Sequence, residues 1–263
     1  MASIYSPELE TAIAAAKAAG AIQLELIGRV GTREKADRSL VTEADLASEL
    51  EILPRLRDHF PQDSILSEES GVTGPSSGRQ WIVDPLDGTT NFSRGLPVFA
   101  VSIALWEDEE PAVGVVYIPV LDELFTATRD GDAYLNGQPI RASGVGTVRE
   151  AMINCYFDRH GMLEPGLQLF SSVARSCEGR VKIMGSSASM LCWVACGRID
   201  AQMRNKTHLW DFAAGALVLQ RAGGRLTDFE EQPLKRTGQS LLGTNGRIHA
   251  ELGAIARAAN ERK

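Results

Sequence analysis

The sequence predicts an α+β protein in which mixed β-sheets are layered with helices. From residue 97 to residue 137 the apolar pattern has a period of two and is interrupted by turn signals, which is typical of an antiparallel meander. Helical patterns precede this region. After it, helix and strand alternate, and this order fits sheets packed against helices.

Helix start and stop signals support the predicted helices. Ser6 can cap the first one, with Pro7 at its first position. Thr42 can cap the second, and Asp45, three residues later, completes a shortened capping box. The fourth predicted helix ends at Gly197, which is expected in the C′ position. The predicted helices cover residues 6–30, 41–56, 164–177, 186–197, 210–224 and 247–260.

The strands are predicted from short apolar runs bounded by glycine, proline, asparagine and aspartate. Polar residues 31–40 and Gly/Ser/Pro-rich residues 71–79 are predicted to be loops. The predicted strands cover residues 64–66, 81–83, 98–106, 112–118, 123–129, 132–137, 179–185, 199–204, 224–229 and 240–245.

Composition excludes several classes of protein. The chain has 263 residues, 44% of them hydrophobic, and a formal net charge of −7. This content suffices for a sizeable core, and the acidic balance argues against a nucleic-acid partner. No apolar run approaches the ~18–20 residues that cross a bilayer. The N-terminus does not resemble a signal peptide, and the four cysteines are expected to be reduced, so we expect a cytoplasmic protein.

Carboxylates follow or precede apolar elements at three places in the chain. They are Glu68 and Glu69 after "SIL", Asp84 and Asp87 after "WIV", and Asp211 before "FAAGALVL". Each has an ordinary structural explanation by itself: surface charge, turn formation or a helix N-cap. The histidines are scattered and the cysteines lack ligand spacing, so any metal site would use oxygen ligands.

The stretch "WIVDPLDGTTNF" at 81–92 is harder to explain structurally. Pro85 removes a ladder donor and restricts Asp84 to an extended conformation. The Pro-Leu step thus fixes Asp84, Asp87 and the Leu86 carbonyl relative to one another. Converging carboxylates repel unless a cation lies between them. A two-metal site would place Asp84 between two ions. Glu68 would lie on one side of it, and Asp87 and Asp211 on the other.

Two segments could bind a phosphate. Gly88 allows close approach of the backbone, and the N–H groups of residues 88–90 could open a helical turn. The segment "GSSAS" at 185–189 opens another predicted helix. No P-loop, GxGxxG or GxSxG motif is present.

Taken together, "WIVDPLDGTTNF", "ILSEES", "LWDFAAG" and "DELFTATRDGDAYLNGQPI" resemble the inositol monophosphatase family of Mg²⁺-dependent, Li⁺-sensitive phosphatases. The resemblance covers nearly the whole chain and implies a layered αβαβα sandwich of the sugar phosphatase type, usually a homodimer. It implies one domain, 1–263, in which residues 1–145 carry most metal ligands and residues 146–263 carry Asp211 and the substrate-side residues.

The resemblance also implies roles for individual residues. Glu68, Asp84 and the Leu86 carbonyl resemble the ligands of a first Mg²⁺, and Asp84, Asp87 and Asp211 those of a second; a third, weaker ion would depend on Glu68. Thr89 and Asp45 resemble the pair that orients and deprotonates the attacking water, which would attack phosphorus in line without a phospho-enzyme. Lys35 lies in a loop where members often carry lysine. The residues expected to contact a small phosphorylated substrate are Asp87, Gly88, Thr89, Gly185, Ser187, Arg204 and Asp211.

One position departs from the family pattern. Inositol-preferring members carry a glutamate seven residues before the aspartate that matches Asp211, and here that residue is Arg204. Arginine cannot accept a hydrogen bond from a sugar hydroxyl, but it can bind an anion. Alternatively, Arg204 simply faces solvent. Fructose 1,6-bisphosphate and histidinol phosphate therefore compete with inositol phosphate as expected substrates, and a non-catalytic, partner-binding protein of the same fold is a remoter alternative.

Overall fold

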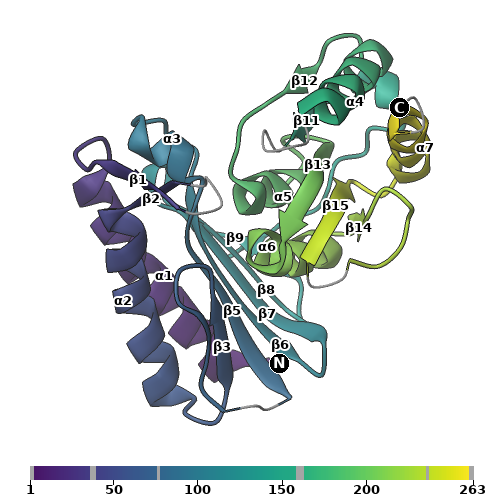
Figure 1. Ribbon diagram of the computed structural model, residues 1–263. Helices are drawn as coiled ribbons and strands as arrows, with labels where there is room; N and C mark the ends of the chain where they lie inside the picture. Colours follow the sequence, from purple (N-terminus) through teal and green to yellow (C-terminus); the bar gives the residue numbers. More distant parts are fainter. Residues whose placement is uncertain (1–2, 36–39, 76–77, 158–162, 235–236, 261–263) are drawn as a thin grey trace.

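The structure is a computed structural model that describes residues 3–35, 40–75, 78–157, 163–234 and 237–260. Its helices and sheets form alternating layers (Figure 1). Helices α1 and α2 pack on one face of the larger sheet, α5 and α6 lie between the two sheets, and α4 and α7 cover the outer face of the smaller sheet. The predicted α+β sandwich with αβαβα layers is confirmed. The helices are α1 (Ser6–Leu26), α2 (Glu43–His59), α3 (Thr89–Ser93), α4 (Leu163–Ser176), α5 (Ser187–Ala195), α6 (Leu209–Arg221) and α7 (His249–Asn260).

The larger sheet has the strand order β10-β9-β8-β7-β6-β5-β3-β4. Strands β6 to β9 form the predicted antiparallel meander, and β5 and β10 extend it at its two ends. Strand β3 runs parallel to β5. Strands β6 and β7 are buried on both faces because helices cover the sheet from both sides. The strands are β3 (Ser64–Ser67), β4 (Gly71–Thr73), β5 (Arg79–Asp87), β6 (Ala100–Glu107), β7 (Glu110–Ile118), β8 (Glu123–Thr128), β9 (Ala133–Leu135) and β10 (Gln138–Pro139).

The smaller sheet has the strand order β12-β11-β13-β15-β14 and mixes parallel and antiparallel pairs. Strand β11 is parallel to β12 and β13, and β15 is antiparallel to β13 and β14. Its strands are β11 (Ile153–Tyr156), β12 (Val181–Lys182), β13 (Ala201–His208), β14 (Arg225–Thr227) and β15 (Thr237–Thr244). Two 3₁₀ turns, Pro119–Leu121 and Val148–Glu150, complete the described elements.

Several expectations about local structure are wrong. Ser6 does not cap the first helix, because it is the first residue of α1 and Tyr5 occupies the N-cap position. The segment predicted as a polar loop at 31–40 contains β1 (Thr32–Glu34) and the start of β2 (Leu40–Thr42), which pair as a small hairpin. The predicted loop at 71–79 begins with the edge strand β4. The strand predicted at 81–83 is nine residues long and continues through Pro85 to Asp87. Short exposed strands such as β1 carry no apolar alternation, so the sequence pattern gives no signal for them.

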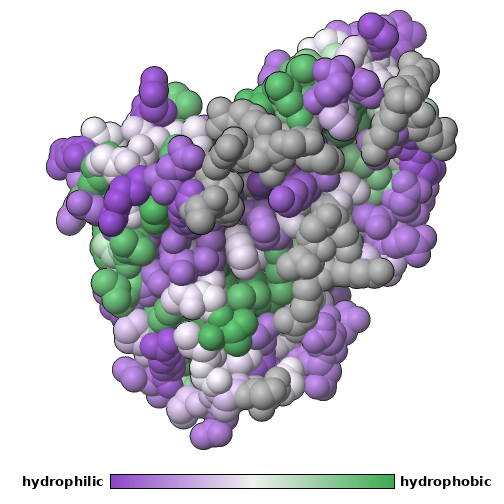
Figure 2. All heavy atoms as spheres, in the orientation of Figure 1, coloured by the Kyte–Doolittle hydropathy of each residue, from purple (hydrophilic) through white to green (hydrophobic). Residues whose placement is uncertain are grey.

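The core is divided among the layers. One apolar cluster joins α5 and α6 to the larger sheet, a second joins α1 and α2 to its other face, and a third joins α4 and α7 to the smaller sheet. On the face shown in Figure 2, hydrophilic residues are interspersed with smaller hydrophobic areas. Among the described residues, no helix is both long and apolar enough to span a membrane.

Candidate active site

A β-bulge in β5 places two aspartates on the same face of the larger sheet. Asp84 pairs with Ser102 and Asp87 pairs with Ala100, so three steps along β5 match two along β6. Residues i and i+3 of a regular strand point to opposite faces, but one extra residue restores the same face. Pro85 and Leu86 in "DPLD" together supply this extra residue. As a result, both carboxylates point toward α5 and α6.

Three buried carboxylates converge at this point. Asp84, Asp87 and Asp211 each offer an oxygen atom, and these atoms lie within 4.8 Å of one another. Asp84 and Asp87 come from the larger sheet, whereas Asp211 lies in the first turn of α6, in the layer between the sheets. The sequence therefore predicted correctly that these three aspartates would meet.

Backbone and hydroxyl donors fix Asp87 from the start of α5. Its Oδ2 accepts hydrogen bonds from the Ser186 hydroxyl at 2.8 Å and from the Ala188 N–H at 2.7 Å. Ser186 adopts a left-handed conformation with φ 47°, which directs its side chain into this contact. Segment 185–189, considered for phosphate binding, thus uses donors of its first turn to bind Asp87.

Asp211 is the third residue of α6 and not its N-cap, which is His208. Its Oδ2 accepts from the His208 N–H at 2.7 Å and from the Thr207 hydroxyl at 3.1 Å. The helix-capping explanation of Asp211 is therefore partly right: one oxygen stabilises the helix start. The side chain still joins the acidic cluster.

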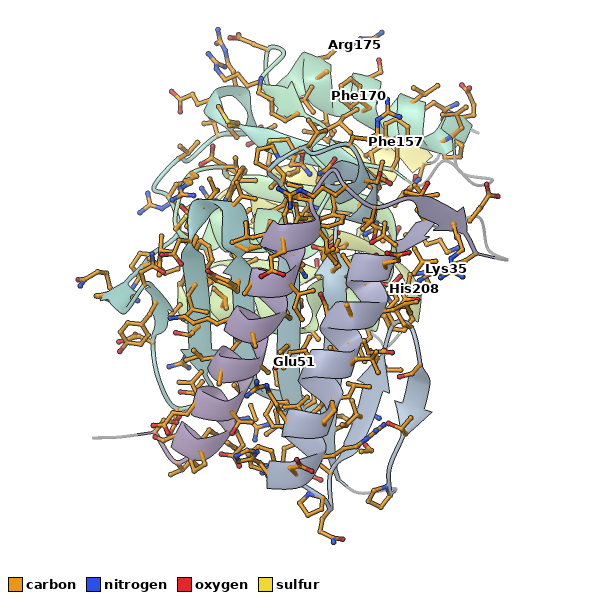
Figure 3. The ribbon with its side chains drawn as sticks, turned by 90° about the vertical axis from the view of Figure 1, so that its left-hand side faces the viewer. Lys35, Glu51, Phe157, Phe170, Arg175 and His208 are labelled. Carbon is orange, nitrogen blue, oxygen red and sulfur yellow. The ribbon has the colours of Figure 1, made fainter. Side chains whose placement is uncertain are left out.

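Glu68 lies close to the cluster but contacts a lysine. Lys35 Nζ is 3.0 Å from Glu68 Oε1 and 2.5 Å from Glu69 Oε1, so Lys35 does reach this region. Glu68 follows β3, and its N–H donates to the Val83 carbonyl, which places it beside β5. In Figure 3, Lys35 and His208 lie on the same side of the molecule.

Burial and neighbouring negative charges raise the pKa values of Glu68, Asp84 and Asp87. Burial raises the pKa of Asp84 well above its usual range, and the charges of Glu68, Asp87 and Asp211 raise it further. The pKa of Glu68 and that of Asp87 are also raised, chiefly by burial, although Lys35 and Ser186 respectively oppose the change. A site in which several carboxylates destabilise one another's charge favours a bound cation.

Thr89 and Asp45 form a second polar group next to the bulge. The Thr89 hydroxyl lies 3.0 Å from Asp45 Oδ1 and 3.2 Å from the Leu86 carbonyl oxygen. Asp45 is buried and occupies the third position of α2, where its Oδ2 accepts from the N–H and hydroxyl of Thr42. The predicted capping box is present, and burial raises the pKa of Asp45.

Gly88 is required for a reason that sequence reasoning missed. It has φ +100°, and a Cβ there would lie 3.0 Å from the Val98 carbonyl oxygen and 3.2 Å from Ser186 Cβ. It is also the residue before α3, so the short helical turn expected at 88–90 is present. Gly88 thus allows the chain to turn between the backbone of Val98 and Phe99 and the side chain of Ser186.

Arg204 points into the site and not into solvent. Its side chain is only 18% exposed; Nη1 lies 2.9 Å from Ser187 Oγ and 3.2 Å from Asp211 Oδ2. The guanidinium stacks over the Tyr156 ring at 5.2 Å. The solvent-facing alternative is therefore wrong, and a cation stands where the inositol-preferring pattern has a carboxylate.

Several residues that support the site gave no sequence signal. Asn91 Nδ2 donates to the carbonyls of Val98 and Met184, each at 2.8 Å, and so ties α3 to the loop before α5. Gln23 also contacts the bulge, through the Pro85 carbonyl. Such residues bond to backbone carbonyls or to a partner distant in sequence, and no local pattern marks these contacts.

The donor set fits a hard divalent cation. All hydrogen bonds that the three aspartates accept from described residues fall on one oxygen each: Oδ1 of Asp84 and Oδ2 of Asp87 and Asp211. Within the part of the chain that the structure describes, each carboxylate is thus oriented by hydrogen bonds to one of its two oxygens. Buried carboxylate and carbonyl oxygens held in this way suit Mg²⁺.

Comparison with known proteins assigns the layered fold and its clustered carboxylates to the metal-dependent phosphomonoesterases. The profile of the inositol monophosphatase family matches residues 5–262, and the chain belongs to this family. It is similar to inositol-1-monophosphatase of Synechocystis sp., with 38% identity over 97% of this chain and 92% of the relative. It is also similar to fructose-1,6-bisphosphatase/inositol-1-monophosphatase of Thermotoga maritima, with 34% identity over 89% and 88%.

The crystal structure of the extragenic suppressor protein suhB from Bartonella henselae has the same fold. It matches with a TM-score of 0.91 and 32% identity, covering 96% of this chain and 99% of the other. The family resemblance inferred from the motifs is thereby confirmed.

Proposed function

We propose that this protein hydrolyses a small phosphate monoester with Mg²⁺ as cofactor. The observation that carries the proposal is the meeting of Asp84, Asp87 and Asp211 within 4.8 Å in a buried site. Burial and the charges of Glu68, Asp87 and Asp211 raise the pKa of Asp84, so an ionised Asp84 is costly here unless a cation is bound.

The proposed ligands follow the arrangement of the acids. Glu68, Asp84 and the Leu86 carbonyl would hold one Mg²⁺, and Asp84, Asp87 and Asp211 a second; a third, weaker ion would depend on Glu68. When bound, the ions supply neutralisation of phosphate charge and a lowered pKa for a coordinated water.

The protein's own contribution to proton transfer is assigned to Thr89 and Asp45. The Thr89 hydroxyl lies within hydrogen-bond distance of Asp45 Oδ1, so its oxygen can accept a hydrogen bond from a water while its own proton is directed to the carboxylate. Thr42 holds the second oxygen of Asp45 and thereby fixes the direction of the acceptor. The backbone N–H groups at the start of α3 are proposed to face the phosphate.

Inositol 1-phosphate is the first proposed substrate, in line with the name of the Synechocystis relative. A sugar bisphosphate, or another anionic ester such as histidinol phosphate, is a second candidate because Arg204 lies inside the site beside Ser187 and Asp211. The Thermotoga relative carries both activities in its name.

Phosphate release from a panel of monoesters, with Mg²⁺ or with EDTA, tests the reaction. We expect release only with Mg²⁺. Equal release in EDTA would overturn the metal-dependent mechanism, and no release from any ester would favour the partner-binding alternative. We further propose that the protein is inhibited by Li⁺, is a homodimer and is cytoplasmic. Phosphate release in the presence of LiCl tests the first property, and light scattering in solution tests the second.

Arg204→Glu tests the choice of substrate. If Arg204 binds an anionic group, the variant should lose kcat/KM for fructose 1,6-bisphosphate by at least about tenfold more than for inositol 1-phosphate. Lys182→Glu makes the same charge change on the edge strand β12 and serves as the control. An unchanged ratio would remove Arg204 from substrate recognition.

A further inference from the structure

The buried face of α1, which packs against α2 and the larger sheet, is built from small side chains with one exception. Its buried residues are Ala12, Ala15, Ala16, Ala19, Gly20 and Gln23. Gln23 is fully buried near the C-terminal end of the helix. A buried amide is unfavourable unless its polar atoms are bonded, so its contacts indicate its role.

The contacts of Gln23 are directed at the bulge. Its Nε2 donates to the Pro85 carbonyl at 2.7 Å and lies 3.3 Å from Ser48 Oγ on α2. Its Oε1 has no hydrogen-bond partner within the described residues. Because the Gln23 amide bonds through Nε2 and leaves Oε1 without a partner, its net contribution to stability is small. We therefore look for its role in the group that it positions, the Pro85 carbonyl.

The bulge is the part of β5 that the sheet holds least. Pro85 and Leu86 together lie opposite a single residue of β6, between the pairs made by Asp84 and Asp87. A bulge disrupts the ladder locally, and Pro85 has no N–H to donate. The carbonyl of Pro85 is instead held from the helix layer behind the sheet by Gln23 (the α1 and α2 side, which faces the viewer in Figure 3).

We propose that Gln23 is a positioning residue for the metal ligands. By fixing the Pro85 carbonyl it fixes the peptide that leads to Leu86, and with it the separation of Asp84 from Asp87 and the direction of the Leu86 carbonyl. Gln23 lies about sixty residues before the motif and touches none of its carboxylates. The inference rests on the proposed function, because it assigns the bulge to metal binding.

Isothermal titration calorimetry of the metal-free protein with Mg²⁺ and with Mn²⁺ tests the proposal. Gln23→Met keeps an unbranched side chain of similar length and removes the donor. We expect the dissociation constant for the metal to rise about tenfold, as is typical when an outer partner of a ligand is lost. The unfolding temperature should change little, because removal of the unbonded Oε1 offsets loss of the hydrogen bond to the buried Pro85 carbonyl.

Ser48→Ala is the matched control. It removes a buried hydroxyl beside Gln23 without touching Pro85, so the metal dissociation constant should stay at the wild-type value. An unchanged constant in Gln23→Met, or an equal rise in Ser48→Ala, would overturn the assignment. If Gln23→Met does not fold, Gln23→Asn retains an amide that is too short to reach Pro85 and gives the same comparison. Absence of metal binding by the wild-type protein would contradict the proposed function instead.

Discussion

At the scale of single residues, the site depends on carboxylates whose ionisation the fold disfavours. Asp84 is the most constrained of them: it is 1% exposed, and its pKa is raised by burial and by the charges of Glu68, Asp87 and Asp211. Since a group of raised pKa costs stability wherever it is ionised, the metal-free fold carries this cost at neutral pH. Function and stability are therefore opposed at Asp84.

Asp84→Asn should separate the two. In EDTA at pH 7.5 we expect the free energy of unfolding to rise by roughly 1–2 kcal/mol, because a buried charge is removed. Phosphate release with Mg²⁺ should fall by about 10³-fold or more. Urea unfolding and a phosphate assay measure the two effects. Asp58→Asn, the same change on an exposed helix position, should alter neither; an Asp84→Asn protein less stable than wild type would contradict this account.

Thr89→Val tests the proton-directing pair. The variant keeps the shape of the side chain but removes the hydroxyl between Asp45 and Leu86. We expect kcat to fall by about 10²- to 10³-fold with little change in KM, whereas Thr89→Ser should retain most of the activity. Steady-state kinetics at saturating Mg²⁺ provide the measurement, and a Thr89→Val enzyme with wild-type kcat would exclude the role.

The sequence predicted the chemical groups of the site better than their geometry. Carboxylates at the ends of apolar elements stand out by residue type, so Asp84, Asp87 and Asp211 could be found. The bulge could not, because it is a property of the pairing between β5 and β6. The inward direction of Arg204 was likewise unpredictable, since position in a strand does not fix side-chain contacts.

At the scale of elements, the long apolar or well-capped segments were predictable and the short polar ones were not. Helix α2 has a clear cap, α6 is a long apolar segment, and strands β6 to β8 are apolar runs bounded by turn signals. Strand β4 and the β1–β2 hairpin exist because a neighbouring strand offers pairing, and tertiary pairing leaves no trace in local composition. The packing distance between α6 and β7 was also invisible in the sequence.

Gly114→Ala tests that packing distance. A Cβ at Gly114 in β7 would lie 2.6 Å from the Ala214 backbone oxygen in α6, so strand or helix must shift. We expect a loss of about 1–3 kcal/mol in the free energy of unfolding, measured by urea denaturation. Gly144→Ala, where a Cβ meets nothing within 4 Å, is the control and should change stability by less than about 0.5 kcal/mol. Equal stability of the two variants would refute the close contact.

At the scale of the whole molecule, a buried histidine links the smaller sheet to α7 and makes stability depend on pH. His249 is fully buried, and its two ring nitrogens each lie 2.9 Å from a hydroxyl, those of Thr227 and Thr244. Burial, assisted by the charge of Arg225, lowers its pKa to about 4. The unfolded state, in which histidine has a pKa near 6.5, therefore binds the proton more readily.

The contribution of neutral His249 to the free energy of unfolding is fully present above pH 6.5, and it is lost as the pH falls toward 4. Between pH 7 and pH 5 we expect wild type to lose about 1–2 kcal/mol more than His249→Gln does, after allowance for solvent screening. Urea unfolding at the two pH values measures this difference. His59→Gln, at an exposed position, should behave as wild type, and parallel pH profiles for wild type and His249→Gln would contradict the prediction.

The position of Asp211 has a consequence for the cohesion of the molecule. Asp84 and Asp87 belong to the larger sheet, while Asp211 arrives on α6, which also packs against the smaller sheet. Their negative charges face one another across the boundary between the larger sheet and α6. Without a cation, their repulsion disfavours the packing of these two layers. A divalent cation shared by the three would reverse the sign of that force and act as a cross-link between distant parts of the chain. Metal binding would then link α6 to the larger sheet much as a disulfide links two segments of a chain. We therefore expect the two sheets to unfold together when the metal is bound.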